Sequence, residues 1–151
     1  MKILYTLLLT LLLTTSAYAS FERYCNARFG FCVDVDRNWG EEATSVNNDG
    51  RSFFNTDGFR MSVYGSYNAL DQTLEAHQEG YKSEFERITY EVKKQSWYAL
   101  TGLKDDELIY IKTFLRHDTF YTLYVRYPQA TKSHYNWVVT RLAKSFQVTA
   151  K

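Results

Sequence analysis

The chain has 151 residues, with 18 Lys and Arg against 17 Asp and Glu, so its formal charge is close to zero. This length suits a single domain, and the balanced charge argues against nucleic acid as a partner, because phosphate binding needs a basic excess or a basic stripe. Aromatic residues make up 17% of the chain and proline occurs once, a composition that excludes intrinsic disorder.

The N-terminal segment has the pattern of a secretory signal peptide. Lys2 gives a positive start, residues 3–13 form an apolar run, and a small-x-small cleavage signal ends at Ala19, directly before Ser20. The apolar run is too short for a transmembrane anchor. We therefore expect cleavage near the Ala19–Ser20 bond.

After removal of the signal peptide 1–19, residues 20–151 are expected to form one domain in the periplasm or outside the cell. Thiols tend to pair in such compartments. The spacing of Cys25 and Cys32 suits the two strands of a tight hairpin, and we predict a structural disulfide between them. A redox pair would need a C-x-x-C spacing, which this chain lacks.

The first half of the chain is predicted to be rich in strands. Residues 29–35 and 51–67 contain strand patterns, and the second stretch alternates apolar and polar positions, as half-buried strands do. Turn-forming residues at 47–50 (Asn-Asn-Asp-Gly) and 57–58 (Asp-Gly) mark chain reversals.

The pattern then changes to the period of an amphipathic helix. Large side chains recur at steps of three and four residues: Leu70, Leu74, His77, Tyr81, Phe85 and Ile88. Asn68 is a good N-cap for this helix, because its side chain can accept a hydrogen bond from the first turn.

After Ile88 the period returns to two and predicts four further strands, at residues 90–95, 97–101, 107–115 and 119–127. Both faces of the last two strands are apolar or aromatic, which is typical of strands covered on both sides. A second helix is predicted over about 132–144. This order predicts an α+β domain, in which a twisted antiparallel sheet of about six strands is sandwiched by two main helices.

Two stretches resemble the PsbP-like domain. The segment from Tyr24 to Val35, followed by Trp39, resembles the opening of that family, in which an aromatic-Gly-Phe strand leads to a turn with proline and then tryptophan. Asp36 stands where the family usually has the proline. The later segments 97–102, 109–112, 120–123, 127–128 and 143–146 resemble the second half of the same fold.

The resemblance implies an α/β/α sandwich, the architecture shared by the photosystem II extrinsic protein and the Ran-binding Mog protein. It also implies a non-enzymatic domain that binds another protein, and sometimes a metal ion, through one sheet edge or face. No binding residue of the family has a recognisable counterpart in this sequence, so the resemblance assigns none.

The sequence contains no recognisable catalytic or metal-binding motif. His117 and Asp118 would need a nearby nucleophile, and without a G-x-S-x-G elbow we interpret them as turn residues. His77, on the helical stripe, is interpreted as a partly buried, hydrogen-bonded residue, and His134 as a solvent-facing one. Metal-ligand spacings such as H-E-x-x-H are also lacking. We therefore expect no catalytic residue, no metal and no cofactor.

Aromatic side chains exceed what two helices can cover, and Tyr and Trp often anchor protein interfaces. The candidate partner-binding residues are Tyr64, Tyr67, Trp97, Tyr98, Tyr121 and Trp137. Arginines could frame such a surface: Arg51, Arg60, Arg116, Arg126 and Arg141.

Our leading hypothesis is an exported, non-enzymatic module that binds another protein in the periplasm, in the concrete form of an inhibitor or immunity-type protein. One alternative is a protein that binds a glycan or another small ligand by aromatic stacking. A second alternative is a hydrolase with an unrecognised site.

Overall fold

The computed structural model describes residues 21–43 and 45–149. The predicted signal peptide, residues 1–19, lies outside this part of the chain. Within residues 21–43 and 45–149, none of the helices combines the length and the apolar character that a membrane span requires.

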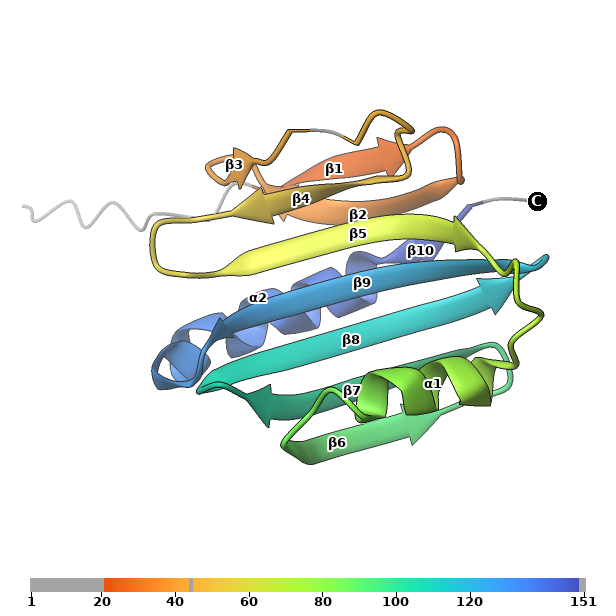
Figure 1. Ribbon diagram of the computed structural model, residues 1–151. Coiled ribbons are helices and arrows are strands. Elements are labelled where there is room, and N and C mark those ends of the chain that lie inside the picture. The colour runs from red at the N-terminus through yellow and green to blue at the C-terminus, as the bar shows by residue number, and fades with distance from the viewer. Residues whose placement is uncertain (1–20, 44, 150–151) are drawn as a thin grey trace, which may run out of the picture.

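The described strands form two antiparallel sheets (Figure 1). The three-stranded sheet has the order β1-β2-β10 and consists of β1 (Phe21–Asn26), β2 (Phe31–Asp36) and β10 (Gln147–Val148). The seven-stranded sheet has the order β3-β4-β5-β9-β8-β7-β6 and consists of β3 (Gly40–Glu41), β4 (Gly50–Phe54), β5 (Arg60–Tyr67), β6 (Arg87–Lys93), β7 (Trp97–Lys104), β8 (Glu107–Arg116) and β9 (Thr119–Pro128). The helices are α1 (Leu74–Lys82) and α2 (Lys132–Ser145), with the 3-10 helix η1 (Gln129–Thr131) directly before α2.

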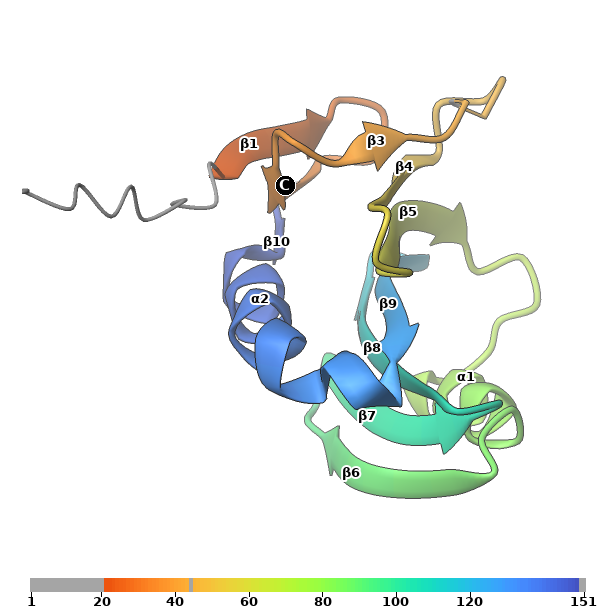
Figure 2. The ribbon, with the colours of Figure 1, turned by 90° about the vertical axis from the view of Figure 1, so that its left-hand side faces the viewer.

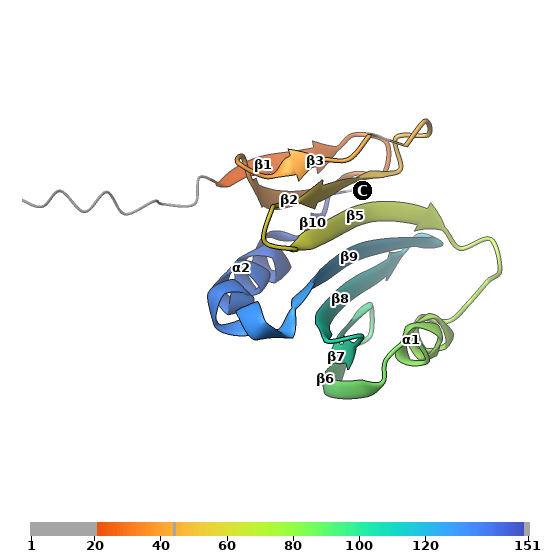
Figure 3. The same cartoon turned by 60° about the vertical axis from the view of Figure 1, so that its left-hand side comes forward.

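The two helices cover opposite faces of the large sheet, which confirms the predicted sandwich (Figure 3). On one face, Leu142 of α2 packs in a core with Leu123 of the sheet and Phe31 of the small sheet. The small sheet lies beside α2 and closes this core (Figure 2). On the other face, Leu74 of α1 packs in a separate core with Ile111. Because strand side chains alternate between faces, β8 and β9 contribute to both cores.

The helix α1 begins later than the predicted stripe. Thr73 is its N-cap, since its hydroxyl accepts a hydrogen bond of 3.1 Å from the backbone N–H of Ala76. Asn68, the predicted cap, instead closes a turn: its side chain donates to the carbonyl of Gln72 (2.9 Å) and accepts from the N–H of the same residue (2.8 Å). Asn68 therefore bonds the backbone in a turn before the helix.

The helix also ends earlier than predicted. After Lys82 the chain leaves the helix, and the Phe85 ring packs against the core under α1. Gly102 of β7 makes room for this ring, because a side chain at that position would collide with it. Ile88 then belongs to β6. Phe85 and Ile88 thus continue the helical spacing in sequence while their backbone is not helical.

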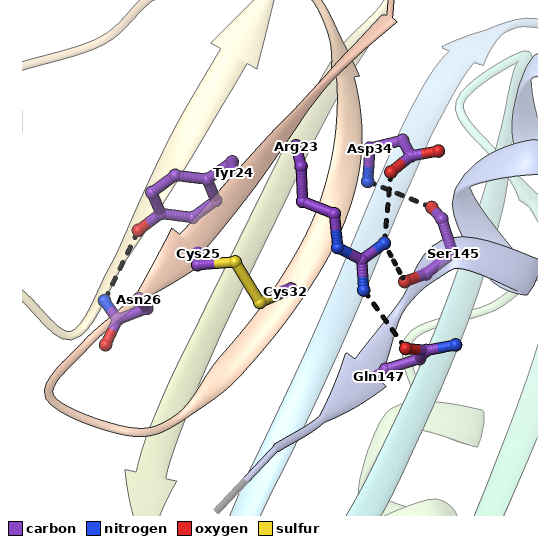
Figure 4. Close-up of a disulfide and its surroundings, with 8 residues drawn as sticks. All are labelled: Arg23, Tyr24, Cys25, Asn26, Cys32, Asp34, Ser145 and Gln147. Carbon is purple, nitrogen blue, oxygen red and sulfur yellow. Dashed lines mark hydrogen bonds and ion pairs between the residues drawn. A yellow bond between two sulfur atoms is a disulfide. The ribbon is translucent and has the colours of Figure 1, made fainter.

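The predicted hairpin and second helix are present. Cys25 and Cys32 are direct partners in the β1–β2 register and form a disulfide (Figure 4). The helix α2 ends one residue beyond the predicted limit, with Tyr135, Val138 and Leu142 on its buried side. The separate small sheet, in contrast, was not predicted.

Candidate functional site

A cavity of about 480 Å³ lies between α2 and the strands of the small sheet; we call it the α2 groove. Its walls combine an aromatic ring with charged and hydroxyl side chains. The lining residues are Arg23, Asp34, Trp137, Thr140, Arg141, Lys144 and Ser145.

Helical periodicity explains why α2 presents these side chains together. Trp137, Arg141 and Lys144 are spaced four and three residues apart, which places them on one side of the helix. The buried stripe of α2, which includes Val138 and Leu142, occupies the side that faces the sheet. The apolar stripe therefore orients the helix, and this orientation turns Trp137 and the two cations toward the groove.

Asp34 organises the floor of the groove. One carboxylate oxygen accepts from Arg23 (3.1 Å) and the other accepts from Arg141 (3.2 Å). Arg23 also donates to the carbonyl of Ser145 (3.3 Å) and to the side chain of Gln147 (3.1 Å), as Figure 4 shows. This network links β1, β2 and the end of α2, so the two guanidinium groups are held in defined positions.

The aromatic wall of the groove is Trp137, which has further rings behind it. The Phe21 ring lies 5.8 Å from that of Trp137 and 6.1 Å from that of Trp39, measured between ring centroids. The Arg141 guanidinium lies 4.4 Å from the centroid of the Phe21 ring, within cation–π range. Trp137 still exposes 50% of its surface. The groove thus presents a half-exposed indole whose position is supported by neighbouring rings.

No protein-family model and no curated protein matches the sequence. Among solved structures, cyanobacterial PsbP (CyanoP) from Synechocystis sp. PCC 6803 is similar with a TM-score of 0.65 and 16% identity, over 89% of this chain and 95% of that one. The Ran-binding protein Mog1p from Saccharomyces cerevisiae is similar with a TM-score of 0.58 and 10% identity, over 87% of this chain and 96% of that one. A mutant of Mog1 gives a TM-score of 0.57 at 9% identity, over 87% of this chain and 97% of that one.

The chain has a PsbP-like fold. This confirms the fold that the sequence resemblance implied. At these identities the likeness concerns the fold, and the α2 groove is defined by this chain's own residues.

The PsbP-like fold places the candidate partner-binding residues in different environments. Trp137 lines the α2 groove. Tyr67 is exposed at the end of β5, where its ring lies 5.2 Å from that of Phe29. Trp97 is half-buried on β7, and Tyr64 is half-buried on β5. Only Trp137 of the predicted set lines the groove.

Tyr98 and Tyr121 are corrections to the predicted set, because both are buried. Tyr98 lies under α1, where its hydroxyl is 2.9 Å from Nδ1 of His77. Tyr121 faces the opposite core, with its ring 6.4 Å from that of Phe31. Neither side chain can reach a partner in the folded protein, so placing them on a binding surface was wrong.

Sequence reasoning missed several groove residues, namely Arg23, Asp34, Thr140, Lys144 and Ser145. The spacing of Trp137, Arg141 and Lys144 on the polar side of α2 is a signal that could have found the helical half. Nothing in the local sequence indicates that β1 lies beside this helix.

His117 and His77 lie in different environments. His117 and Asp118 form the exposed β8–β9 turn, with φ values of 46° and 54°. His77 is half-buried on α1, and its ring stacks on Phe120 with centroids 3.9 Å apart. Among residues 21–43 and 45–149, no three His, Cys, Asp or Glu side chains are grouped as metal ligands.

Burial of His77 predicts a pH-dependent stability. Burial lowers the pKa of His77 below 6.5, because the charged imidazolium loses solvation. As the pH falls below about 6.5, the unfolded chain therefore takes up this proton before the folded protein does, and the free energy of unfolding decreases. The decrease due to one such group is at most about 1.4 kcal/mol per pH unit.

This prediction can be checked by urea unfolding between about pH 7.5 and pH 5. His77→Gln should flatten the pH dependence, since glutamine retains hydrogen-bonding capacity but does not titrate. His134→Gln, at an exposed position on α2, is the control and should leave the slope unchanged. Equal slopes for the wild type and His77→Gln would contradict the prediction.

Proposed function

We propose that this chain is an exported, non-enzymatic module that binds another protein in the periplasm, as an inhibitor or immunity-type protein does, and that the α2 groove contacts the partner. The observation that carries the proposal is the half-exposed Trp137 beside the fixed guanidinium of Arg141. Tryptophan and arginine are two of the residue types that dominate binding energy at protein interfaces.

Two further observations support this proposal. The Cys25–Cys32 disulfide fits an oxidising compartment, in agreement with the secretory pattern of residues 1–19. The Ran-binding protein Mog1p has the same fold, which makes protein binding a function that the scaffold can support. Its partner is not carried over to this chain, because fold alone does not imply function.

The groove has the physical properties of an interface centre. Trp137 can bury a large apolar surface at a small entropic cost, because the Phe21 ring already limits its movement. Arg141 is held by Asp34, so less side-chain freedom is lost when it binds. We therefore expect these two residues to contribute much of the binding energy.

The test is partner capture from a periplasmic extract by the mature protein and by Trp137→Ala. The partner identified with the wild type is then titrated against both proteins. We expect an affinity at least about 30-fold weaker for the variant, the effect of losing roughly 2 kcal/mol at an interface hot spot.

The matched control is Tyr90→Ala, because Tyr90 is 54% exposed but lies on the edge strand β6. This variant should bind the partner like the wild type. The proposal is wrong if Trp137→Ala retains full affinity while remaining folded. A change in tryptophan fluorescence on adding cell-wall fragments, without any captured protein, would favour the glycan hypothesis instead.

A further inference from the structure

This inference rests on the proposed function: we infer that an acidic peptide segment of the partner protein enters the α2 groove, and that this segment has an apolar side chain two positions away from a carboxylate. Three cations line the groove, namely Arg23, Arg141 and Lys144, against one acid, Asp34. The cavity is therefore positively charged although the whole chain is formally near neutral.

Asp34 cannot neutralise this excess. Both of its oxygens are already used, one by Arg23 and one by Arg141. Within residues 21–43 and 45–149, Lys144 takes part in no ion pair. The groove thus has the exposed ammonium group of Lys144 and the guanidinium of Arg141, of which one nitrogen is paired with Asp34. A carboxylate of the partner can contact either group.

Most carbonyls at the C-terminal end of α2 already accept hydrogen bonds. Of the last four, that of Ser145 accepts from Arg23, that of Ala143 accepts from Lys112, and that of Leu142 accepts from the N–H of Phe146. The partial negative charge of a helix end resides on its unpaired carbonyls. Lys144 is therefore available to a ligand.

The spacing along α2 sets the separation of the apolar and acidic groups in the ligand. With a rise of 1.5 Å per residue, Trp137 and Arg141 lie about 6 Å apart along the helix axis. In an extended peptide, side chains two positions apart are separated by roughly 7 Å. An apolar residue can therefore contact Trp137 while an acidic residue two positions further along reaches Arg141 or Lys144.

Charge favours a peptide segment over an anionic membrane surface. Basic clusters that bind membranes usually combine about four to eight Lys and Arg residues, whereas this open groove has three cations beside one acid. An acidic segment needs only one or two of these cations. The experiment must therefore distinguish binding to vesicles with anionic lipid from binding to a peptide.

The probe is a fluorescein-labelled peptide, acetyl-Gly-Phe-Ser-Glu-Glu-Gly, titrated with the mature protein by fluorescence anisotropy. A second peptide with glutamine in place of both glutamates is the charge control. We expect the affinity of the acidic peptide to be at least about tenfold higher than that of the control peptide, because one hydrogen bond to a charged group has about this effect. Its affinity should also fall as salt increases from about 50 to 300 mM.

Protein variants locate the effect. Lys144→Gln and Arg141→Gln should each weaken binding of the acidic peptide about tenfold. Lys94→Gln, at an exposed position outside the groove, should leave it unchanged. Circular dichroism checks that each variant is folded, and Lys144→Gln is the cleaner test because Lys144 forms no ion pair in the described part of the chain.

The inference is overturned if the two peptides bind equally, if neither binds, if Lys144→Gln binds the acidic peptide as the wild type does, or if vesicles with anionic lipid bind while the peptide does not. Its failure is distinct from failure of the proposed function. If the peptide does not bind but Trp137→Ala still loses the captured partner, the groove is a protein-binding site with a different preference. If neither variant nor peptide has an effect, both proposals are wrong.

Discussion

Replacing Phe31 with alanine is expected to lower the free energy of unfolding by about 3–5 kcal/mol, the usual range for removing a fully buried phenylalanine. Phe31 of β2 has no exposed surface. Its ring packs edge-to-face against those of Tyr24, Tyr121 and Phe146, at centroid distances of 6.2, 6.4 and 6.2 Å. The side chain thus joins the small sheet to β9 and to the end of α2, and its removal leaves a cavity among all three.

The measurement is denaturant unfolding of Phe31→Ala and of Leu70→Ala. Leu70 is 80% exposed, so its replacement should change the free energy of unfolding by no more than about 0.5 kcal/mol. A loss below about 1 kcal/mol for Phe31→Ala would mean that the β1–β2 hairpin does not pack on the sheet in this way.

Removing the disulfide is expected to destabilise the protein by about 2.5 kcal/mol in the chain-entropy model. The bond connects Cys25 and Cys32, which are seven residues apart and are direct neighbours in the β1–β2 register. Its main effect is to restrict the unfolded chain, so the folded hairpin should keep its geometry. Arg23 of β1 donates to Asp34 of β2, and both line the α2 groove. Separation of β1 from β2 would therefore also disrupt the groove.

The experiment compares the wild type with Cys25→Ala/Cys32→Ala in the presence and absence of a reducing agent. Alanine is chosen because Cys32 is buried, where a serine hydroxyl would need a new hydrogen-bond partner. Reducing agent should destabilise the wild type and have no effect on the variant. If the oxidised wild type and the variant have the same free energy of unfolding, the disulfide contributes nothing to stability.

Local sequence patterns were sufficient to predict an element and its buried side where one period continues through the whole element. In α2, the spacing of Tyr135, Val138 and Leu142 predicted both the helix and its buried side. In β8 and β9, apolar residues on both faces predicted coverage from both sides, as the two cores show. The disulfide was predicted from compartment and spacing, and it is present.

The same reasoning failed where a pattern extends across two kinds of backbone. Leu70 to Ile88 maintain helical spacing, but only the middle of this stretch is the helix α1. The turn that Asn68 makes with Gln72 delays the start of the helix. Just after the helix ends, the Phe85 ring packs over Gly102, where there is no side chain to block it. The second of these contacts is with a strand later in the chain, which a local window does not include.

Neighbouring positions in the amino-acid sequence were enough to indicate the α+β class and the apolar sides of α2, β8 and β9, because side-chain periodicity depends only on local backbone geometry. They could not indicate which aromatic rings would be exposed. Tyr98 and Tyr121 become buried only when α1 and β2 pack over the large sheet. Trp137 becomes the wall of a groove only when β1, from the other end of the chain, lies beside α2, since burial and charge clustering arise from contacts between distant segments.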